Sequence, residues 1–228
     1  MEASLLDGCR AAFRVHLNEC YGQTEADFVI GHCGGRWPLR GGSMGRAYPG
    51  TEAAVRRDDG SLANASELGE VVVRSPHPTM LLNYWNRPDA TREKFSEDWL
   101  RTGDLARMDE EGYFWFESRL DDVIKSSGYR IGPAEIEECL LRHPSVSQAA
   151  VVGAPDPLRG QIVMAYLVAA AGANPDSRLE EELRDLVRSR LAAYQYPRIV
   201  EFVTELPMTT SGKVDRAELR GRAATKEG

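Results

Sequence analysis

The stretch SRLDDVIKSSGYRIGPAEIEE, residues 118–138, marks the point where the pattern of the sequence changes. The chain up to this point reads mostly as short strands joined by turns, as in WLRTGDLARMDEEGYFWFES, residues 99–118. Within the stretch, Pro133 stands where a helix can begin, because the first helical residue needs no N–H donor. The sequence therefore predicts a β-rich segment over residues 1–118 and an α+β unit over residues 119–228.

The segment after the change alternates helices with apolar strands. One helix is predicted over PAEIEECLLRH, residues 133–143, and a second behind Ser177 and Glu180, which form an S-x-x-E capping box. Leucines and a valine then recur at helical spacing and predict one apolar face. Three strands and a last helix are predicted over SQAAVVGAP, GQIVMAYLVAAA, RIVEFVTEL and DRAELRGRAA, residues 147–155, 160–171, 198–206 and 215–224.

The composition excludes several classes of protein. The chain has 35 acidic and 28 basic side chains and a formal net charge of -7, which argues against non-specific nucleic-acid binding as its main role. The longest apolar run, residues 162–171, is shorter than the roughly 20 residues that cross a bilayer, and the N-terminus does not resemble a signal peptide. The four cysteines form no C-x-x-C pair and are read as reduced thiols. We expect a cytoplasmic protein without a transmembrane segment and without a nucleic-acid partner.

Four short segments gather glycines and polar side chains: YGQTE, RTGDL, SRLDDVIKSSGYR and SGKVDR, which begin at residues 21, 101, 118 and 211. The aromatic ring, hydroxyl and carboxylate of YGQTE could stack a base, bind a phosphate and hold Mg²⁺. Each segment also has a plainer interpretation: a strand end, a turn aspartate, a charged linker and an exposed lysine. SGKVDR is not a phosphate-binding P-loop, because Pro207 stands five residues before Gly212 and Val214 follows the lysine.

The order and spacing of these segments resemble the C-terminal half of the adenylate-forming enzymes, which include acyl-CoA synthetases, luciferases and the adenylation domains of peptide synthetases. The resemblance extends from about Leu17 to Arg220 and is greatest to medium-chain acyl-CoA synthetases, through DDVIKSSGYRIGPAEIE, APDPLRGQIVMAYLV and YQYPRIVEFVTELP. It implies an α+β fold in two parts. Residues 1–118 would be the C-terminal, incomplete part of the AMP-binding domain, and residues 119–228 the small mobile C-terminal domain.

The resemblance implies an AMP-forming acid–thiol ligase. Such an enzyme activates a carboxylic acid with ATP to an acyl-adenylate and transfers the acyl group to coenzyme A. Acetyl-specific members tend to carry tryptophan where Gly22 stands, so a longer acid is expected, with a medium-chain fatty acid first. ATP or AMP, Mg²⁺, coenzyme A and the acid are the implied small molecules.

Positions that match the family's motifs imply a nucleotide site. Tyr21, with Gly22 beside it, would stack on the adenine ring. Thr24 would contact a phosphate, and Asp104 would accept from the ribose hydroxyls. Arg119 would contact ribose or phosphate.

Further matches imply residues for the two reaction steps. Lys213 would bridge the carboxylate and the α-phosphate during adenylation, and Glu25 would bind Mg²⁺, so that Lys213, Glu25 and Thr24 form the catalytic set. Asp121 matches the hinge about which the C-terminal domain swings between the two half-reactions. The turn that follows would bind coenzyme A through Ser127, Gly128 and Arg130.

The sequence departs from the family pattern in two places. The Ser/Thr/Gly-rich phosphate loop of the family lies well upstream of YGQTE and has no counterpart here, and Ser118 replaces a glycine. We therefore expect that the chain alone does not adenylate, that a partner chain could supply the N-terminal part, and that residues 1–118 fold less well than residues 119–228.

Two other functions stay open at this point. The chain could be a non-catalytic remnant that binds nucleotide, coenzyme A or a partner protein. It could also be an adenylation domain of peptide synthesis, although no carrier segment follows Arg216.

Overall fold

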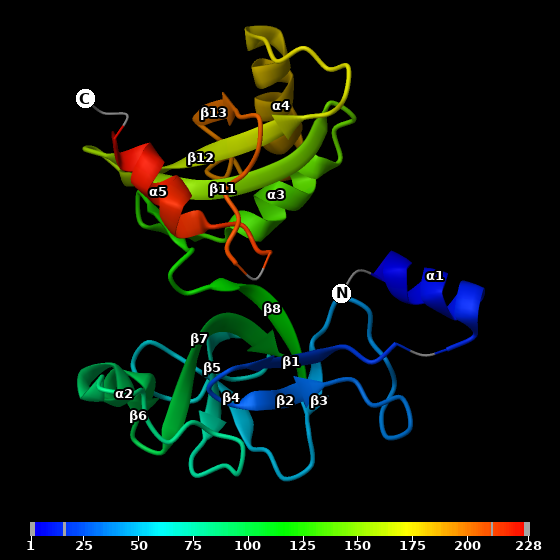
Figure 1. The fold of residues 1–228 in the computed structure, drawn as a ribbon, viewed down its shortest axis with the longest axis vertical. Helices are drawn as coiled ribbons and strands as arrows, with labels where there is room; N and C mark the ends of the chain where they lie inside the picture. The colour runs from blue at the N-terminus through cyan, green and yellow to red at the C-terminus, as the bar shows by residue number, and fades with distance from the viewer. Residues whose placement is uncertain (1–2, 16, 211, 226–228) are drawn as a thin grey trace. The chain divides into compact units, whose positions relative to one another are not determined.

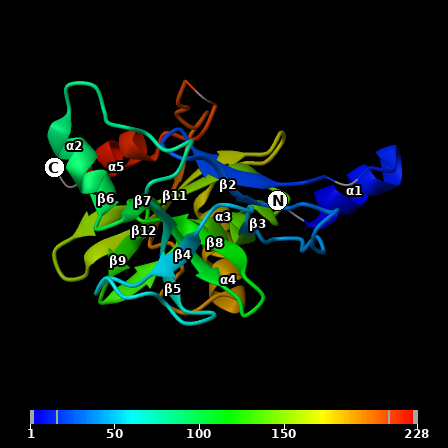
Figure 2. The same ribbon diagram turned by 90° about the horizontal axis from the view of Figure 1, so that it is seen from below.

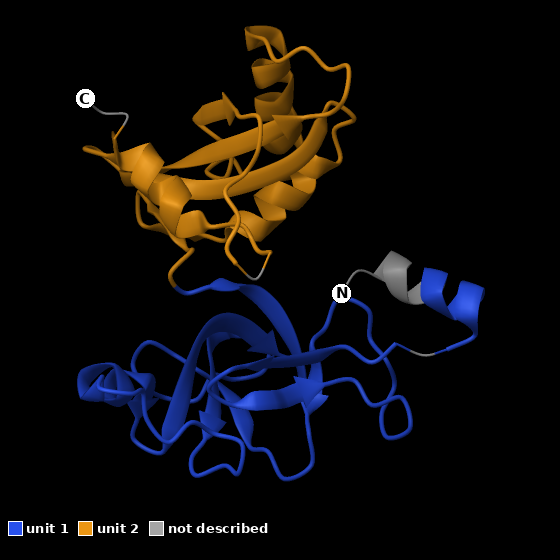
Figure 3. Cartoon of the chain, in the orientation of Figure 1, with its two compact units in different colours: residues 1–120 blue, residues 121–228 orange. Residues whose placement is uncertain are grey.

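The computed structural model of the chain describes residues 3–15, 17–210 and 212–225. The chain divides into two compact units, residues 1–120 and 121–228, and each unit is described by itself (Figure 3). The division lies two residues after the boundary that the sequence predicts. Asp121, the expected hinge, is the first residue of the second unit.

The first unit is built on one antiparallel sheet of eight strands in the order β1-β2-β3-β8-β7-β5-β4, with β6 paired to β7 (Figure 1). Helix α1 precedes the sheet, and the short helix α2 leads into β6. The elements are α1 (Ala3–Phe13), β1 (Cys20–Gln23), β2 (Asp27–Gly31), β3 (Gly45–Ala47), β4 (Ala53–Arg56), β5 (Leu68–Arg74), α2 (Pro88–Lys94), β6 (Phe95–Ser96), β7 (Trp99–Met108) and β8 (Tyr113–Arg119).

Strand β7 organises this sheet because it pairs with β5, β6 and β8. Its Leu100 and Ala106 are fully buried and pack with apolar side chains of β2, β5 and β8, such as Ile30, Val73 and Phe114. The RTGDL segment therefore lies inside a central strand, and its aspartate is not the turn residue of the plainer interpretation.

The second unit is an α+β layer structure around a five-stranded sheet in the order β10-β9-β12-β11, with β13 parallel to β12. Figure 2 shows its helices and strands from below. The elements are β9 (Ile124–Ser126), β10 (Tyr129–Ile131), α3 (Pro133–Leu141), β11 (Val146–Asp156), β12 (Gly160–Ala169), α4 (Ser177–Arg190), β13 (Ile199–Phe202) and α5 (Arg216–Ala224).

The helices of this unit cover both faces of its sheet because alternate strand residues point to opposite sides. Val151 of β11 faces a core that includes Ile136 of α3 and Leu183 of α4. Its neighbour Val152 faces a second core that contains Leu219 of α5. The apolar helical spacing in the sequence thus corresponds to the buried face of α4.

One local expectation needs correction. The N-cap of α4 is Asp176 and not Ser177, because Asp176 is extended and its Oδ1 accepts the backbone N–H of Leu179 at 2.9 Å. The carboxylate also suits the positive end of the helix better than a hydroxyl does.

Two further segments are placed by the structure. After the Asp59–Gly60 turn the chain forms a bridge between Arg56 and Leu62. The first three residues of YGQTE belong to β1.

In the part of the chain that the structure describes, every helix is too short or too polar to cross a membrane.

Replacement of Leu100 by alanine tests the packing around β7. Leu100 is fully buried, whereas Leu82 in the same unit is 92% exposed. We expect Leu100→Ala to lower the free energy of unfolding by about 2–5 kcal/mol, because it removes buried methyl groups and leaves a cavity. Leu82→Ala should change it by less than about 0.5 kcal/mol.

Urea denaturation followed by tryptophan fluorescence measures this difference. The four tryptophans, Trp37, Trp85, Trp99 and Trp115, all belong to the first unit, so the signal reports on that unit alone. Equal losses in the two leucine variants would contradict the assigned core.

Candidate active site

A buried carboxylate joins three strands of the first unit. Asp104 lies in β7 with a side chain that is only 7% exposed. Its Oδ2 accepts the hydroxyl of Tyr21 from β1 at 2.6 Å, and its Oδ1 accepts Nη1 of Arg119 from β8 at 2.9 Å. Asp104 and Arg119 are direct partners in the strand register. The structure thus brings together three of the residues expected at the nucleotide site.

The carboxylate of this cluster can accept further hydrogen bonds from a ligand. A carboxylate offers about four acceptor positions, and the Tyr21 hydroxyl and Arg119 guanidinium use one position on each oxygen. Burial, and then the charge and hydrogen bond of Asp104, raise the pKa of Tyr21 far above its usual value. The phenol therefore stays protonated and donates at neutral pH, which fixes its ring next to the carboxylate.

Two irregularities in the strand pairing place Asp104. The β5–β7 register shifts between Glu70 and Val72, and the β7–β8 register shifts next to Leu105, so RTGDL is bulged on both sides. Bulges next to functional sites commonly redirect a side chain. Gly103 supplies the positive φ of 77° that the irregular backbone needs.

Polar side chains of β5 and β7 hold this bulge. Thr102 accepts the backbone N–H of Asp104 at 3.1 Å and donates to the carbonyl of Val71 at 2.7 Å. Glu70 accepts the backbone N–H of Gly103 through one oxygen and Nε of Arg101 through the other, both at 2.9 Å. The arginine of RTGDL thus anchors the carboxylate that shapes the bulge.

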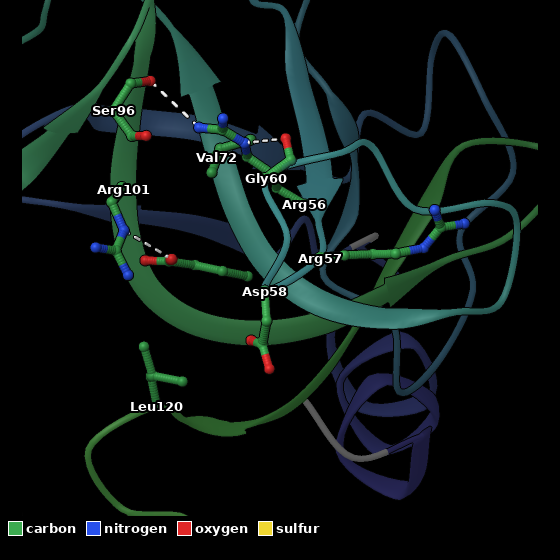
Figure 4. A pocket seen from close by; sticks show the side chains of 9 residues that line it. Arg56, Arg57, Asp58, Gly60, Val72, Ser96, Arg101 and Leu120 are labelled. Carbon is green, nitrogen blue, oxygen red and sulfur yellow. Dashed lines mark hydrogen bonds and ion pairs between the residues drawn. The ribbon is translucent and has the colours of Figure 1, made fainter.

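A pocket of about 200 Å³ lies beside Arg101 in the same unit (Figure 4). Arg56, the most deeply placed of its three arginines, donates to the backbone carbonyls of Gly60 and Ser96 at 2.5 and 3.3 Å. Arg57, which points to the far side, forms an ion pair with Glu67. These guanidinium groups already have protein partners, so the pocket supports the sheet and is not the site of the cluster.

Glu25 forms a second polar centre in the turn after β1. Its carboxylate accepts the hydroxyl of Tyr84 at 2.5 Å, and its backbone carbonyl accepts the N–H of Leu81. Burial acts to raise the pKa of Glu25, but the Tyr84 hydrogen bond and the charges of Lys94 and Arg119 outweigh it and lower the pKa below its usual value. Burial and the same hydrogen bond raise the pKa of Tyr84 to about 12.

This carboxylate fits a magnesium ion of the nucleotide-bound type. Among the described residues, no group of three or more histidine, cysteine, aspartate or glutamate side chains gathers as a metal cage. Mg²⁺ in nucleotide enzymes is commonly held by one or two carboxylates, with substrate phosphates and waters as the other ligands. Glu25 is ionised at neutral pH and can supply such a ligand. Thr24 beside it is exposed.

Position 22 requires glycine because the backbone of the paired strand β2 passes close to it. A Cβ atom at this position would lie 1.9 Å from the carbonyl oxygen of Asp27 on the paired strand, next to the bulge between Tyr21 and Gly22. A larger residue here would need a different path of β1 and β2.

Sequence reasoning missed three residues of this region. Tyr84 binds Glu25, Lys94 donates to Oε1 of Gln23 at 2.8 Å, and Nε2 of Gln23 donates to the carbonyl of Thr102 at 3.2 Å. Tyr84 and Lys94 lie outside every motif, and only the folded sheet brings them to YGQTE. Gln23 lies inside YGQTE, where its polar side chain was a signal that could have been used.

Lys213 belongs to the second unit, where it lies exposed in a tight loop closed by a bridge between Met208 and Val214. Thr209 closes the loop by accepting the backbone N–H of Lys213 at 3.1 Å and donating its own N–H to the carbonyl of Lys213 at 2.7 Å. Ser211, the first residue of SGKVDR, lies outside the described residues. The loop presents the lysine side chain from a backbone that is held on both sides.

The residues expected to bind coenzyme A lie in the β9–β10 hairpin. Ser127 and Gly128 both have positive φ, 49° and 84°, as a two-residue hairpin turn of type I′ requires. Arg130 is exposed on β10. Next to it, the ring of Tyr129 stacks on Tyr194 with 4.1 Å between the ring centroids.

Much of the remaining motif sequence in the second unit supports the fold. Asp215 caps α5 by accepting the N–H of Glu218 at 3.0 Å. Arg216 donates Nη2 to both oxygens of Glu137, at 2.6 and 2.7 Å. Asp122, next to the expected hinge residue, accepts Nη1 of Arg220 at 2.7 Å.

The contact between Tyr84 and Glu25 can be tested by its pH dependence. Tyr84→Phe should lower the free energy of unfolding of the first unit by about 1 kcal/mol at pH 7, because a hydrogen bond to a charged group is lost. The pKa of Glu25 is lowered in the folded state, so its contribution is complete above the unfolded value of about 4.3 and is lost as the pH falls through the folded value. The difference between wild type and variant should therefore shrink below about pH 4.

The measurement is urea denaturation followed by tryptophan fluorescence at pH 7, 5 and 3. Tyr48→Phe is the matched control, since no hydrogen bond of the Tyr48 hydroxyl to another described residue is found. A Tyr84→Phe effect that stays constant from pH 7 to pH 3 would contradict a hydrogen bond to an ionised carboxylate.

Comparison with protein families matches both units. Residues 1–85 match the family described as AMP-binding enzyme, and residues 135–213 match the AMP-binding enzyme C-terminal domain. The first match includes Tyr21 and Glu25, and the second ends at Lys213.

Several characterised or named proteins are similar in sequence. The chain is 40% identical over 222 residues to an uncharacterized acyl-CoA ligase, YtcI, of Bacillus subtilis (strain 168), a match of 97% of the chain and 42% of the relative. It is 42% identical to 4-hydroxybutyrate-CoA ligase 1 of Metallosphaera sedula and 43% identical to human mitochondrial acyl-coenzyme A synthetase ACSM5. These matches cover 94% and 91% of the chain but 38% and 37% of the relatives, so the chain spans about two fifths of their length.

Solved structures show the same fold. The anthranilate CoA ligase AuaEII in complex with anthranoyl-AMP matches with a TM-score of 0.84 and 35% identity, over 100% of this chain and 43% of that one. An ATP-bound RpMatB-BxBclM chimera matches with a TM-score of 0.90 and 30% identity, over 100% of this chain and 45% of the other.

Proposed function

We propose a function on the premise that the chain belongs to the family of adenylate-forming, AMP-binding enzymes, as the matches to both of its units show. The first unit is assigned to the C-terminal part of the AMP-binding domain and the second to the C-terminal domain. The reaction is that of an AMP-forming acyl-CoA synthetase, in which ATP, a carboxylic acid and coenzyme A are the substrates.

The observation that carries this proposal is the cluster of Tyr21, Asp104 and Arg119. Three residues separated by up to 98 positions meet around one carboxylate that retains acceptor capacity. A buried aspartate with free acceptor positions suits the two adjacent hydroxyls of a ribose, and the neighbouring phenol ring suits the adenine face. Glu25 follows Tyr21 in the same motif, and we assign it to the phosphate end of the nucleotide.

The first half-reaction places two anions next to each other. A carboxylate oxygen of the acid attacks the α-phosphorus of ATP, and pyrophosphate leaves with the electron pair of the broken P–O bond. Lys213, a cation on a well-held loop, offsets the charge that accumulates as the two anions meet. Mg²⁺ held by Glu25 and phosphate oxygens would offset further charge when it is bound.

In the second half-reaction, the thiolate sulfur of coenzyme A attacks the acyl carbon, and AMP leaves with the electrons of the acyl–oxygen bond. The second unit turns about Asp121 between the two steps. The Ser127–Gly128 turn, which has no bulky side chain at its glycine, lets the pantetheine arm approach the backbone, and Arg130 meets a phosphate of coenzyme A.

For the acid we propose a medium-chain fatty acid. The family resemblance associates tryptophan at the position of Gly22 with acetyl-specific members, so the glycine supports a longer acid. The similarity to human acyl-coenzyme A synthetase ACSM5 supports an acyl-coenzyme A product.

The chain spans about two fifths of the length of relatives with such names, and we propose that it does not complete adenylation alone. A second chain that supplies further parts of the site would then be its partner. A non-catalytic module that binds nucleotide or coenzyme A is the alternative.

Nucleotide binding to the chain tests the cluster directly. Asp104→Asn should weaken AMP binding roughly 10–100-fold, because a hydrogen bond to a charged acceptor is replaced by one to a neutral amide. The measurement is isothermal titration with AMP and with 2′,3′-dideoxy-AMP, which lacks the ribose hydroxyls.

Two controls sharpen this titration. Dideoxy-AMP should bind wild type and Asp104→Asn with similar affinity, and the exposed Asp98→Asn should bind AMP like wild type. Equal weakening of both nucleotides by Asp104→Asn would remove the ribose contact from the proposal. Failure of wild type to bind AMP would contradict the proposed nucleotide site itself.

Acid-dependent exchange between ATP and pyrophosphate tests the reaction. We expect no exchange by the 228-residue chain alone, and exchange with octanoate in preference to butyrate or benzoate when the chain is part of a complete enzyme. There, Lys213→Ala should lower the exchange rate at least about 100-fold, because one preorganised cation is lost.

Arg178→Ala is the control for loss of positive charge, since its side chain is 86% exposed on α4. Exchange by the chain alone would contradict its incompleteness. An unchanged rate in Lys213→Ala would contradict the role of the lysine.

A further inference from the structure

Lys94 is a cation of the first unit that lies outside every sequence motif. It is the last residue of α2, and the next residue, Phe95, is extended and begins β6. Strand β6 pairs with β7 through Phe95–Leu100 and Ser96–Trp99, so Lys94 is tied to the strand that carries Asp104. Its side chain therefore starts from a position that the sheet defines.

The ammonium group of Lys94 contacts YGQTE and is linked through it to RTGDL. It donates to Oε1 of Gln23 at 2.8 Å, and the amide nitrogen of Gln23 donates to the carbonyl of Thr102 at 3.2 Å. Because Nε2 of Gln23 is engaged by a carbonyl, its oxygen is the atom that faces the lysine. One side chain of YGQTE thus links Lys94 to RTGDL.

Within the described part of the chain, Lys94 has no carboxylate at ion-pair distance. Glu25, Asp104 and Glu70 attract it from farther away, while Arg119 repels it, and burial lowers the pKa of its ammonium. The nearby carboxylates have closer partners: Asp104 binds Arg119, and Glu25 accepts from Tyr84.

An ammonium carries three donors, and the hydrogen bond to Gln23 uses one of them. A partly buried cation without a close counter-charge is costly unless an anion completes its shell. Lys94 also lines an open cavity of about 510 Å³, together with Tyr84, Trp85, Arg87, Ala90 and Glu93. Within the described residues, two donors of the Lys94 ammonium are thus available to an anionic ligand.

We propose that Lys94 is a phosphate-binding residue of the nucleotide site, with its ammonium in contact with a phosphate oxygen of the bound nucleotide. This inference rests on the proposed function. It differs from the role of Lys213, because Lys94 belongs to the same unit as Asp104 and Glu25. A turn of the second unit about Asp121 would carry Lys213 away but would leave Lys94 in place for both half-reactions.

Titration of the chain with AMP and with adenosine tests this role. Lys94→Ala and Lys94→Gln should weaken AMP binding about tenfold or more, the scale of one lost charge-assisted contact, and leave adenosine binding within about twofold. Lys94→Arg should retain most of the AMP affinity. Arg92→Ala is the matched control, because Arg92 lies on the same helix with a side chain that is 78% exposed.

The outcomes separate the two proposals. If wild type binds adenosine and AMP but the Lys94 variants bind AMP normally, the inference about Lys94 fails and the nucleotide site stands. Equal weakening of adenosine and AMP would show that Lys94 only supports Gln23 and the turn, and would also overturn it. If wild type binds neither ligand, the proposed function fails and the inference fails with it.

Lys94→Gln keeps the comparison valid if the alanine variant unfolds, since glutamine retains a donor for Gln23. Tryptophan fluorescence in urea confirms that each variant is folded before titration.

Discussion

The first unit depends on one ion pair that joins neighbouring strands, between the buried carboxylate of Asp104 and the half-exposed guanidinium of Arg119. Asp104 and Arg119 face each other across β7 and β8, and the Tyr21 hydroxyl completes the arrangement from β1. A carboxylate that is 7% exposed is stable there only because donors surround it. The same requirement fixes the phenol ring and the guanidinium beside the carboxylate. In the proposed function, structural stability and nucleotide recognition would depend on the same group.

The motifs contain two kinds of residue that the sequence alone does not separate. In RTGDL, Asp104 faces the site, whereas Arg101 holds Glu70, which in turn holds the N–H of Gly103. In SGKVDR, Lys213 is exposed, whereas Asp215 caps a helix and Arg216 binds Glu137. In the proposed function, each motif therefore combines a side chain that contacts the ligand with other side chains that hold the local backbone in place.

The fold was largely predictable from local patterns. The apolar segments that form β11 and β12, Pro133 at the start of α3 and the strand-and-turn pattern before residue 118 predicted the two-part α+β organisation, which the structure and its similarity to solved adenylate-forming enzymes confirm. The cap at Asp176 was missed because Ser177 and Glu180 satisfy the same spacing rule, and only backbone dihedrals decide between them.

The predicted site residues of the first unit gather where β1, β7 and β8 meet, but their partners could not be predicted. Tyr84 lies 59 positions from Glu25, and Lys94 lies 71 positions from Gln23. These contacts depend on strand order and on two bulges beside Asp104, which no local pattern in the sequence specifies. These long-range contacts between polar groups could therefore not be predicted from the sequence.

The distribution of charge around the site follows from the same geometry. Asp104 and Arg119 neutralise each other at close range, and Glu25 accepts a hydrogen bond from the neutral phenol of Tyr84. Among the described residues, neither the carboxylate of Glu25 nor the ammonium of Lys94 has an opposite charge at ion-pair distance. Opposite charges that do not pair directly can both be satisfied by a ligand that brings a cation to the first and an anion to the second. A nucleotide phosphate with its magnesium ion is such a ligand. In the proposed function, Glu25 would therefore bind the magnesium ion and Lys94 the phosphate of the same nucleotide.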